Sequence, residues 1–481
     1  MGEVATAGIS SVYERVKIFD NPFAYVVQNG NVGEYCSHCL RIPKDKKLYK
    51  CANCEFAQYC DKNCQRLAWK FHRNECRRLK KVFPNLPLTE VLFLSRIIDR
   101  VLFLETHGDK YGWERNRKWA ELLGHQIDIR NDEEKYKHFE KIYDKMKVFR
   151  GDEMIDREKF FDIFCKSSIN SHSIHSNAGD DIGLALDLGV SAYDHCCRPN
   201  CSLVFDGFIA CLRPLIPEVN AGDPNTAFIS YIDVGRSRYR RRAELKSKWY
   251  FECQCERCCD PEDDILTSIK CQNEDCDNPI ITTEDAEPVM IACSKCKRIC
   301  DEEYVKKAQQ LMLNLPARFS LDADVKELRK MLEGAEKILH WKNIYITRLQ
   351  TAIMHLSGSL KDNLPFMQEK VYANYKQCFP AADRHMGFQL LHIARAHIEK
   401  GERTEALPYA YEAMSIFEVC FGMEHPYYLQ TLALWTYLDT KADKTNDELI
   451  ALMNFHDNRP INVVELLAQN ENPKIEAKTS A

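Results

Sequence analysis

The chain has 481 residues, of which 45% are hydrophobic and 28% charged, and its formal net charge is -5. This length predicts two to four domains, and the composition is ordinary for a globular protein. The longest apolar stretch, residues 91–105, is interrupted by Arg96, Asp99 and Arg100, which argues against a transmembrane span. The 23 cysteines occur largely in C-x-x-C pairs, without an apolar signal segment at the start. This pattern is typical of thiolate–zinc chemistry in a reducing compartment, and both cytoplasmic and nuclear residence fit it.

The first chemical signal follows two short apolar stretches, residues 12–18 and 23–27, which predict one or two strands. Eight Cys and His residues then fall within residues 36–76, and the last of them have helical spacing. Eight nitrogen and sulfur ligands fit two tetrahedral zinc ions with no position left for water, so both sites are expected to be structural. The candidate ligands are Cys36, Cys39, Cys51, Cys54, Cys60, Cys64, His72 and Cys76.

A largely helical region is predicted from residue 88 to residue 164. Apolar residues recur at three- and four-residue intervals between residues 91 and 104, as expected for an amphipathic helix. A second helix, residues 133–149, is charged and is expected to lie on the surface. No catalytic constellation occurs here, and His125 and His138 are interpreted as ordinary polar residues.

The most unusual stretch is Asp194-His195-Cys196-Cys197-Arg198-Pro199-Asn200, within a region (182–258) of short strands and turns. Three further thiols follow at Cys253, Cys255 and Cys258. Structural zinc is almost always tetrahedral, so these three need a fourth ligand. We expect Cys197 to supply it and one metal to join two distant segments. The basic run 236–242 is interpreted as a solvated turn in preference to a surface that steers an acidic partner or nucleic acid.

A second group of cysteines follows Cys258. Cys271, Cys276, Cys293 and Cys296 have a spacing that suits a fourth zinc ion, with Cys300 left over. From residue 302 the pattern is helical. Segments 388–400 and 404–417, separated by Gly401, form a TPR-like helical hairpin or part of a non-repeating helical layer. The polar end, residues 471–481, is expected to be disordered.

The cysteine-rich segment 36–76 resembles a MYND finger, including the Tyr59-Cys60 step and the Ala68-Trp69…His72 segment. The resemblance implies that such a finger binds short peptides, often proline-rich. The surrounding basic residues either contact nucleic-acid phosphates or form a solvated face. The zinc sites implied are Cys36, Cys39, Cys60 and Cys64 for one ion, and Cys51, Cys54, His72 and Cys76 for the other.

Together, the finger and the later motifs resemble the SET and MYND domain (SMYD) family of protein-lysine methyltransferases over nearly the whole chain. The motifs are Asn170-Ser171, Asp194-His195-Cys196-Cys197-x-Pro199-Asn200, Ser230-Tyr231-Ile232-Asp233 and Cys253-x-Cys255-x2-Cys258. The resemblance implies an α+β fold, in which a SET-type β fold is interrupted by the finger and followed by a Cys-rich tail and an α-helical TPR-like domain. The implied domains are 1–30 (start of the SET domain), 36–76 (finger), 77–165 (helical insert), 166–250 (SET core), 251–300 (post-SET tail) and 302–481 (helical domain).

The resemblance also implies the chemistry. S-Adenosylmethionine would contact Asn170, Asp194, His195 and Phe251, and the target lysine of a protein substrate would enter an aromatic channel. Methyl transfer is an in-line displacement that needs alignment and a neutral amine, which a dry aromatic channel favours. The implied channel residues are Tyr231, Trp249 and Tyr250.

Several positions depart from the family pattern. Gly2 and Gly8 are isolated, so no glycine-rich turn opens the domain. Asp194 stands where the family has Asn, Trp249 where it has Tyr, and Gly124 where it has an acidic residue. Two functions therefore compete: a lysine methyltransferase with a divergent site, and a scaffold that binds partners through the finger and the helical domain.

Overall fold

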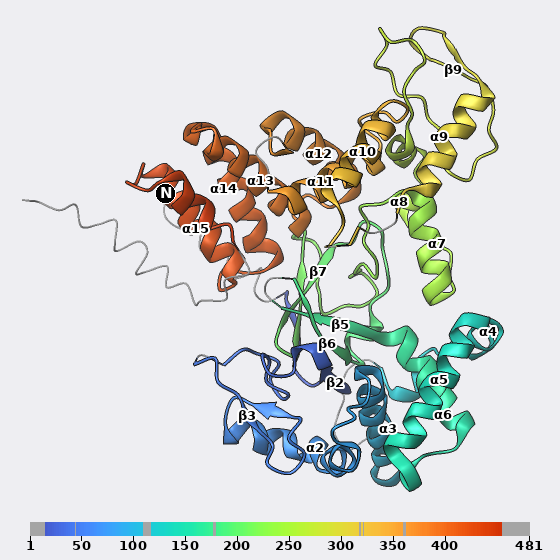
Figure 1. The fold of residues 1–481 in the computed structure, drawn as a ribbon, viewed down its shortest axis with the longest axis vertical. Coiled ribbons are helices and arrows are strands. Elements are labelled where there is room, and N and C mark those ends of the chain that lie inside the picture. Colours follow the sequence, from blue (N-terminus) through green and yellow to red (C-terminus); the bar gives the residue numbers. More distant parts are fainter. Residues whose placement is uncertain are drawn as a thin grey trace, which may run out of the picture.

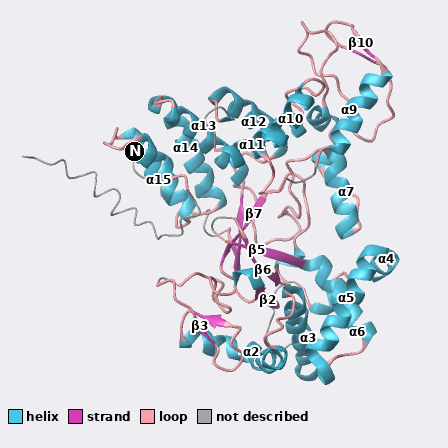
Figure 2. Cartoon of the chain, in the orientation of Figure 1, coloured by secondary structure: helices cyan, strands magenta, loops and turns pink. Residues whose placement is uncertain are grey.

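The structure is a computed structural model that describes residues 15–43, 45–108, 117–176, 179–316, 319–320, 322–358 and 362–454. Gly2, Gly8 and the polar end at 471–481 lie outside these residues. Figure 1 shows a lower lobe built from the first half of the chain and a row of helices, α10 to α15, above it. Strands β5 and β7 lie between the two, and Figure 2 shows most strands gathered at this centre.

The central strands belong to two three-stranded antiparallel sheets. In one, β8 lies between β1 and β7; in the other, β6 lies between β2 and β5. Residues 12–14 of the predicted strand at 12–18 lie outside the described residues, and β1 begins at Lys17; the predicted strand at 23–27 closely matches β2. The strands are β1 (Lys17–Phe19), β2 (Ala24–Val27), β5 (Ser171–His175), β6 (Asp181–Leu186), β7 (Cys201–Asp206) and β8 (Ile209–Pro214).

The cysteine-rich segment forms a small module below the sheets (Figure 1). It consists of a hairpin, β3 (Tyr49–Lys50) and β4 (Gln58–Tyr59), followed by helix α2 (Lys62–Val82). Asp61 caps α2 by accepting a hydrogen bond from the Cys64 backbone N–H at 2.8 Å. This cap starts the helix where the helical spacing of the ligands requires it.

The helical insert packs beside the sheets around a core that includes Phe139, Ile142 and Met146 of α5. The predicted helix at 133–149 is present, and most of its charged residues are exposed, as expected for a surface helix. Its apolar face is buried, together with Arg150 at its end. The insert contains α3 (Thr89–His107), η2 (Trp119–Glu121), α4 (Gln126–Asn131), α5 (Glu133–Arg150), η3 (Gly151–Glu153) and α6 (Arg157–Asn170).

The basic run 236–242 is not a solvated turn. Ser237 caps helix α7 (Arg238–Trp249), and the side chains of Arg236 and Arg241 are buried. The helix was missed because its sequence is dominated by charge, whereas its buried face is formed by Arg241, Leu245 and Trp249. The tail that follows contains α8 (Glu256–Cys259), η5 (Pro261–Thr267), β9 (Ile291–Ala292), β10 (Ile299–Cys300) and α9 (Glu302–Asn314).

The described residues that follow α9 are mostly helical, as predicted. Helices α13 and α14 pack against each other, and the small residues Ala394, Ala406, Ala410 and Ala413 are fully buried there. The helices are α10 (Val325–Glu336), α11 (Ile344–Ser357), α12 (Pro365–Cys378), α13 (Arg384–Glu399), α14 (Arg403–Cys420), α15 (Pro426–Asp439) and α16 (Asn446–Ala451). Within the described ranges, no helix combines the length and apolar character needed to cross a bilayer.

Candidate active site and zinc centres

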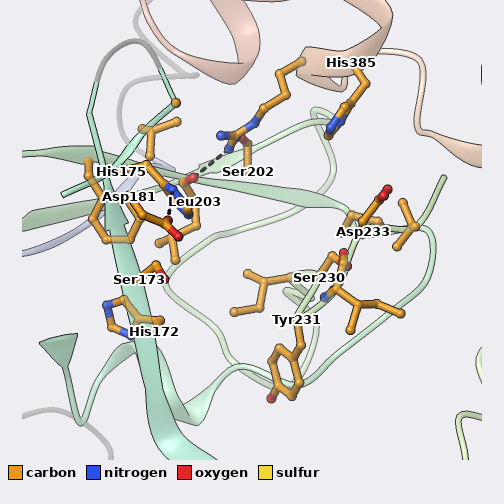
Figure 3. Close-up of a pocket in the computed structure, with 18 of the residues that line it drawn as sticks. His172, Ser173, His175, Asp181, Ser202, Leu203, Ser230, Tyr231, Asp233 and His385 are labelled. Carbon is orange, nitrogen blue, oxygen red and sulfur yellow. Dashed lines mark hydrogen bonds and ion pairs between the residues drawn. The ribbon is translucent and has the colours of Figure 1, made fainter. Parts of the chain in front are cut away.

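A cavity of about 1890 Å³ lies between the central strands and the helical domain. One wall comes from β5, β7 and the loop at 228–234, and the opposite wall comes from α11, α12 and α13. Figure 3 shows His172 and His175 of β5 on the first wall and His385 of α13 on the other. The cavity is therefore a cleft between two parts of the chain that are far apart in the sequence, and it is large enough for a peptide.

Most of the predicted cofactor and channel residues meet in this cavity. They come from the α6–β5 junction, the loop after η4 (Val190–Ala192), the loop after β8, and the end of α7. Gly124 itself is flanked by two lining residues, Leu123 and His125. The predicted residues that line the cavity are Asn170, Asp194, His195, Tyr231, Trp249 and Phe251.

His195 is held in one tautomer by two contacts. Its Nδ1 accepts a hydrogen bond from the Tyr231 backbone N–H at 3.0 Å, so the proton lies on Nε2. Nε2 is 3.2 Å from the sulfur of Cys197 and donates to it. Burial lowers the pKa of His195 to about 4, so the ring is neutral near pH 7. His195 thus links the Cys197 cluster to the loop that carries Tyr231.

Aromatic rings form the inner wall. The Tyr231 ring lies 5.4 Å from that of His195 and 5.2 Å from that of Trp249. The Tyr231 hydroxyl donates to the Tyr193 carbonyl at 2.6 Å, and the Trp249 indole N–H donates to the Ile169 carbonyl at 3.1 Å. Burial and the nearby Asp194 charge raise the pKa of Tyr231, so its hydroxyl remains a donor.

Tyr250 is placed differently from the other predicted channel residues. Its backbone is left-handed, with φ of 61°, and it ends α7. Its ring stacks on His125 at 5.3 Å, and Lys135 Nζ donates to its hydroxyl at 2.8 Å. Among the described residues that line the cavity, Trp249 and Phe251 are present and Tyr250 is not. The turn between Trp249 and Phe251 directs the intervening side chain toward the helical insert.

Three clusters bring together the ligand sets expected for zinc, and the ligand atoms within each cluster lie within 4.8 Å of one another. Four sulfurs about 2.3 Å from a tetrahedral zinc ion are about 3.8 Å apart. The sulfurs of Cys39 and Cys60 are 3.7 Å apart, and those of Cys197 and Cys253 are 3.9 Å apart. The clusters are Cys36, Cys39, Cys60 and Cys64; Cys51, Cys54, His72 and Cys76; and Cys197, Cys253, Cys255 and Cys258.

The third cluster, which we term the junction cluster, is surrounded by arginines that the sequence did not identify as structural. Arg257 donates to the carbonyl oxygens of Cys197 and Cys378, at 3.3 and 2.8 Å. Arg242 donates to the carbonyls of Cys253 and Cys258 at 3.2 and 3.1 Å. A zinc ion with four thiolates carries net negative charge, which these guanidinium groups offset. The basic run 236–242 therefore contributes to stabilising the junction cluster, through Arg242.

Glu75 orients His72, the histidine of the Cys51, Cys54, His72 and Cys76 cluster, by contacting its second ring nitrogen. The Glu75 carboxylate accepts a hydrogen bond from His72 Nδ1 at 3.1 Å and is held by Arg96 at 2.8 Å, leaving Nε2 facing Cys54. Burial opposes ionisation, but the charge of Arg96 and the hydrogen bond from His72 lower the pKa of Glu75 to about 2. The sequence analysis identified His72 but not the supporting residues Glu75 and Arg96, although the i, i+3 spacing of His72 and Glu75 is a signal that could have been recognised.

We expect Glu75→Ala to weaken zinc binding by the finger about 10- to 100-fold, because such partners orient the ligating ring. Competition with a chromophoric chelator measures this affinity. Arg73→Ala, at an exposed position on the same helix, is the control and should leave the affinity unchanged. Equal affinities for the two variants would contradict this role of Glu75.

Residues of the helical domain that line the same cavity were not identified from the sequence. His355 of α11 and His392 of α13 face each other with their Nε2 atoms 3.3 Å apart. Arg384 reaches back across the cleft to the carbonyl of Leu203 at 2.7 Å. No local pattern marks them, because their partners are far away in the sequence.

Comparison with known proteins agrees with this arrangement. A family profile described as MYND finger matches residues 36–76. "Histone-lysine N-methyltransferase SMYD3" of Mus musculus is 26% identical over 419 residues, covering 84% of this chain and 88% of that protein. "Histone-lysine N-methyltransferase ASHR1" of Arabidopsis thaliana is 27% identical over 439 residues, covering 86% and 88%. "SET domain-containing protein 14" of Caenorhabditis elegans is 31% identical over 252 residues, covering 51% and 55%.

The similarity to the first two proteins therefore covers most of the chain and reaches into the helical domain. The α+β fold is confirmed: a SET-type β fold is interrupted by a MYND finger and followed by a Cys-rich tail and an α-helical TPR-like domain. Over most of its length the chain is therefore similar to proteins of the SET and MYND domain (SMYD) family, and these matches support membership of that family.

Proposed function

We propose that this protein is an S-adenosylmethionine-dependent protein-lysine N-methyltransferase that acts on a histone or another protein. The observation that supports this proposal is the convergence of Asn170, His195 and Tyr231 on one cavity. The relatives named as lysine methyltransferases align over most of the chain and support this class of reaction. The domain limits given from the sequence, from the 1–30 segment to the 302–481 domain, are part of the proposal.

The cavity has polar groups suited to the methyl donor. The hydroxyl oxygens of Ser167 and Ser171 are buried without a hydrogen-bond partner among the described residues, and both residues line the cavity. S-Adenosylmethionine supplies an electrophilic methyl group together with an ammonium group, hydroxyls and an adenine ring. Asp194 is exposed in the cavity and would accept hydrogen bonds from the ammonium group, and Phe251 would pack against adenine.

The rings of Tyr231 and Trp249 would form the wall past which the lysine enters. Their faces tolerate a cationic methylammonium group, and the dry surroundings lower the pKa of the lysine, which favours the neutral amine. The cleft between the sheets and α11–α13 would hold the residues that flank the lysine. Tyr250 is assigned a supporting role at the His125 side of this wall.

The finger is proposed to recruit protein partners with proline-rich segments. Leu67 and Trp69 of α2 are 47% and 44% exposed, which suits contact with an apolar peptide. The nucleic-acid phosphates are the alternative partner for the basic residues of this segment.

A scaffold without methyl transfer is the second candidate, and the bonding of the channel favours it. The Tyr231 hydroxyl and the Trp249 indole each donate to a backbone carbonyl, so their donors are already used. Asp194 also provides no amide donor. Calorimetric titration with S-adenosylmethionine separates the candidates: binding supports the enzyme, and no binding supports the scaffold.

We expect the double variant Asp194→Asn, Trp249→Tyr to transfer methyl groups about tenfold faster, which corresponds to one well-placed hydrogen bond of about 1.4 kcal/mol. Asn supplies an amide donor, and Tyr supplies a hydroxyl that orients the lysine nitrogen. Incorporation of labelled methyl groups into a protein pool measures the rate. The matched control Asp443→Asn, Trp435→Tyr changes the same residue types away from the cavity and should have no effect. An unchanged rate in the first variant would support the scaffold.

A further inference from the structure

A fourth cluster of cysteines lies outside the finger and the junction cluster. The sulfurs of Cys271, Cys276, Cys293 and Cys296 lie within 4.8 Å of one another. Cys271 and Cys296 are 3.5 Å apart, and Cys276 and Cys293 are 3.8 Å apart. These distances match the spacing of about 3.8 Å between sulfurs on one tetrahedral zinc ion. They are far from the roughly 2.05 Å of a disulfide bond.

The backbone around Cys293 and Cys296 repeats that of the two C-x2-C turns in the finger. In each turn, a non-glycine residue with positive φ follows the second cysteine, and its N–H donates to the carbonyl of the first cysteine. Such a conformation is uncommon for non-glycine residues and persists where the surroundings fix it. The residues are Leu40 (φ 56°, 3.0 Å), Glu55 (φ 59°, 2.9 Å) and Lys297 (φ 64°, 3.0 Å).

The segment that carries these cysteines has too little apolar packing to fold by itself. Its only strands among the described residues are β9 and β10, each two residues long. Val289, Met290 and Ile299 are more than half exposed, at 53%, 70% and 56%. A small loop-rich segment of this kind needs a staple such as a metal ion.

We propose that Cys271, Cys276, Cys293 and Cys296 bind a fourth structural zinc ion, which makes segment 268–301 a rigid bracket between the SET core and the helical domain. Figure 1 shows this segment around β9 at the outer edge of the molecule, above α9. It is therefore a separate module, distant from the finger at the opposite end.

The loop between the two ligand pairs contacts both neighbours. The buried Glu284 carboxylate accepts a hydrogen bond from Ser237, the cap of α7, and another from the Tyr345 hydroxyl at 2.7 Å. Gln309 of α9 donates to the carbonyls of Thr283 and Ala286 at 2.9 and 3.0 Å. The loop thus joins the start of α7 to the start of α11.

The base of the bracket is tied to the helical domain as well. Lys270 N–H donates to the Ile338 carbonyl at 2.8 Å, and His340 N–H donates to the Ser268 carbonyl at 3.1 Å. Helix α7 ends at Trp249, and α11 carries His355, and both residues line the cavity. A zinc ion in the bracket would therefore hold two opposite walls of the cleft in place from outside.

Metal content of the full-length protein tests the site. Elemental analysis should give four zinc ions per chain for the wild type and three for Cys271→Ser and for Cys296→Ser. Cys259→Ser, which changes an exposed thiol outside the four clusters, should retain four. Three ions in the wild type, with no loss in Cys271→Ser, would overturn the proposal.

Thiol labelling of the wild-type protein tests the zinc site without a variant, so it applies even if the serine variants do not fold. Cys296 and Cys211 are both half-buried, but only Cys296 belongs to a cluster. Cys296 should react with N-ethylmaleimide only after a zinc chelator is added, whereas Cys211 should react at the same rate before and after. Labelling of Cys296 that is independent of the chelator would overturn the site.

Hydrogen exchange tests the bracket. In Cys296→Ser, exchange should rise in segment 268–301 and at the starts of α7 and α11, and it should be unchanged in α2. A rise confined to segment 268–301 would overturn the bracket role. All three measurements (metal content, thiol labelling and hydrogen exchange) are independent of methyl transfer, so their results hold whether or not the proposed activity is found.

Discussion

Cys197→Ser should remove one zinc ion per chain and abolish the proposed binding of S-adenosylmethionine, while the finger keeps both of its ions. Serine is a poor zinc ligand, and the junction cluster is a closed site with four thiolates. Structural zinc contributes about 10–16 kcal/mol of apparent binding free energy in small domains, so loss of one ligand affects folding locally. Elemental analysis and calorimetric titration with S-adenosylmethionine measure the two effects.

The same variant should become sensitive to trypsin after Lys246 and Lys248. These residues lie in the last turn of α7, which Arg242 ties to the Cys253 and Cys258 carbonyls. Cleavage of a locally opened segment follows its open population, which rises tenfold for each loss of about 1.4 kcal/mol. Cys259→Ser is the control and should resist trypsin as the wild type does. Intact α7 and a full zinc content in Cys197→Ser would show that Cys197 is not a ligand.

The zinc sites were predictable from the sequence because their chemistry is local. A C-x2-C turn places two sulfurs together whatever the rest of the chain does, and the finger consists of such pairs plus one helix. Predicting the junction cluster required one further inference, namely that three thiols on a tetrahedral zinc ion need a fourth ligand. That step identified Cys197, 56 residues before Cys253.

The channel was predicted only in part, because a side chain's direction depends on one backbone angle. Trp249, Tyr250 and Phe251 are consecutive aromatic residues, and no sequence pattern distinguishes them. The left-handed φ of 61° at Tyr250 directs its ring to His125 and leaves its neighbours at the cavity. The histidines of α11 and α13 were beyond prediction because tertiary packing alone brings them to the cleft.

The burial of arginines near the junction cluster could not be predicted from the sequence, for a different reason. Charge suggested that residues 236–242 were solvated, and the propensity for burial of Arg is low. Arg241 is nevertheless fully buried, since Asp263 and the junction cluster provide negative charge. The reason for its burial lies 22 residues away at Asp263, where a single-residue pattern gives no signal.

Asp263→Asn should destabilise the region around the junction cluster by about 3–5 kcal/mol, the cost of leaving buried charges without a partner. The Asp263 carboxylate accepts from Arg241 and from Arg257, each at 2.8 Å, and all three side chains are at most 2% exposed. Asn has nearly the same shape but no charge, so the variant removes the compensation without opening a cavity. Hydrogen exchange in α7, measured over a series of urea concentrations, gives the loss of unfolding free energy.

Asp264→Asn is the matched control on the next residue. Asp264 pairs with Arg238 at 2.9 Å, but these side chains are 19% and 23% exposed. Solvent screens this pair, so its loss should cost about 1 kcal/mol or less. Equal losses in the two variants would show that the Arg241–Asp263–Arg257 network has no special role. A larger loss for Asp263→Asn with zinc content unchanged would separate the charge network from the metal as two distinct supports of the same wall.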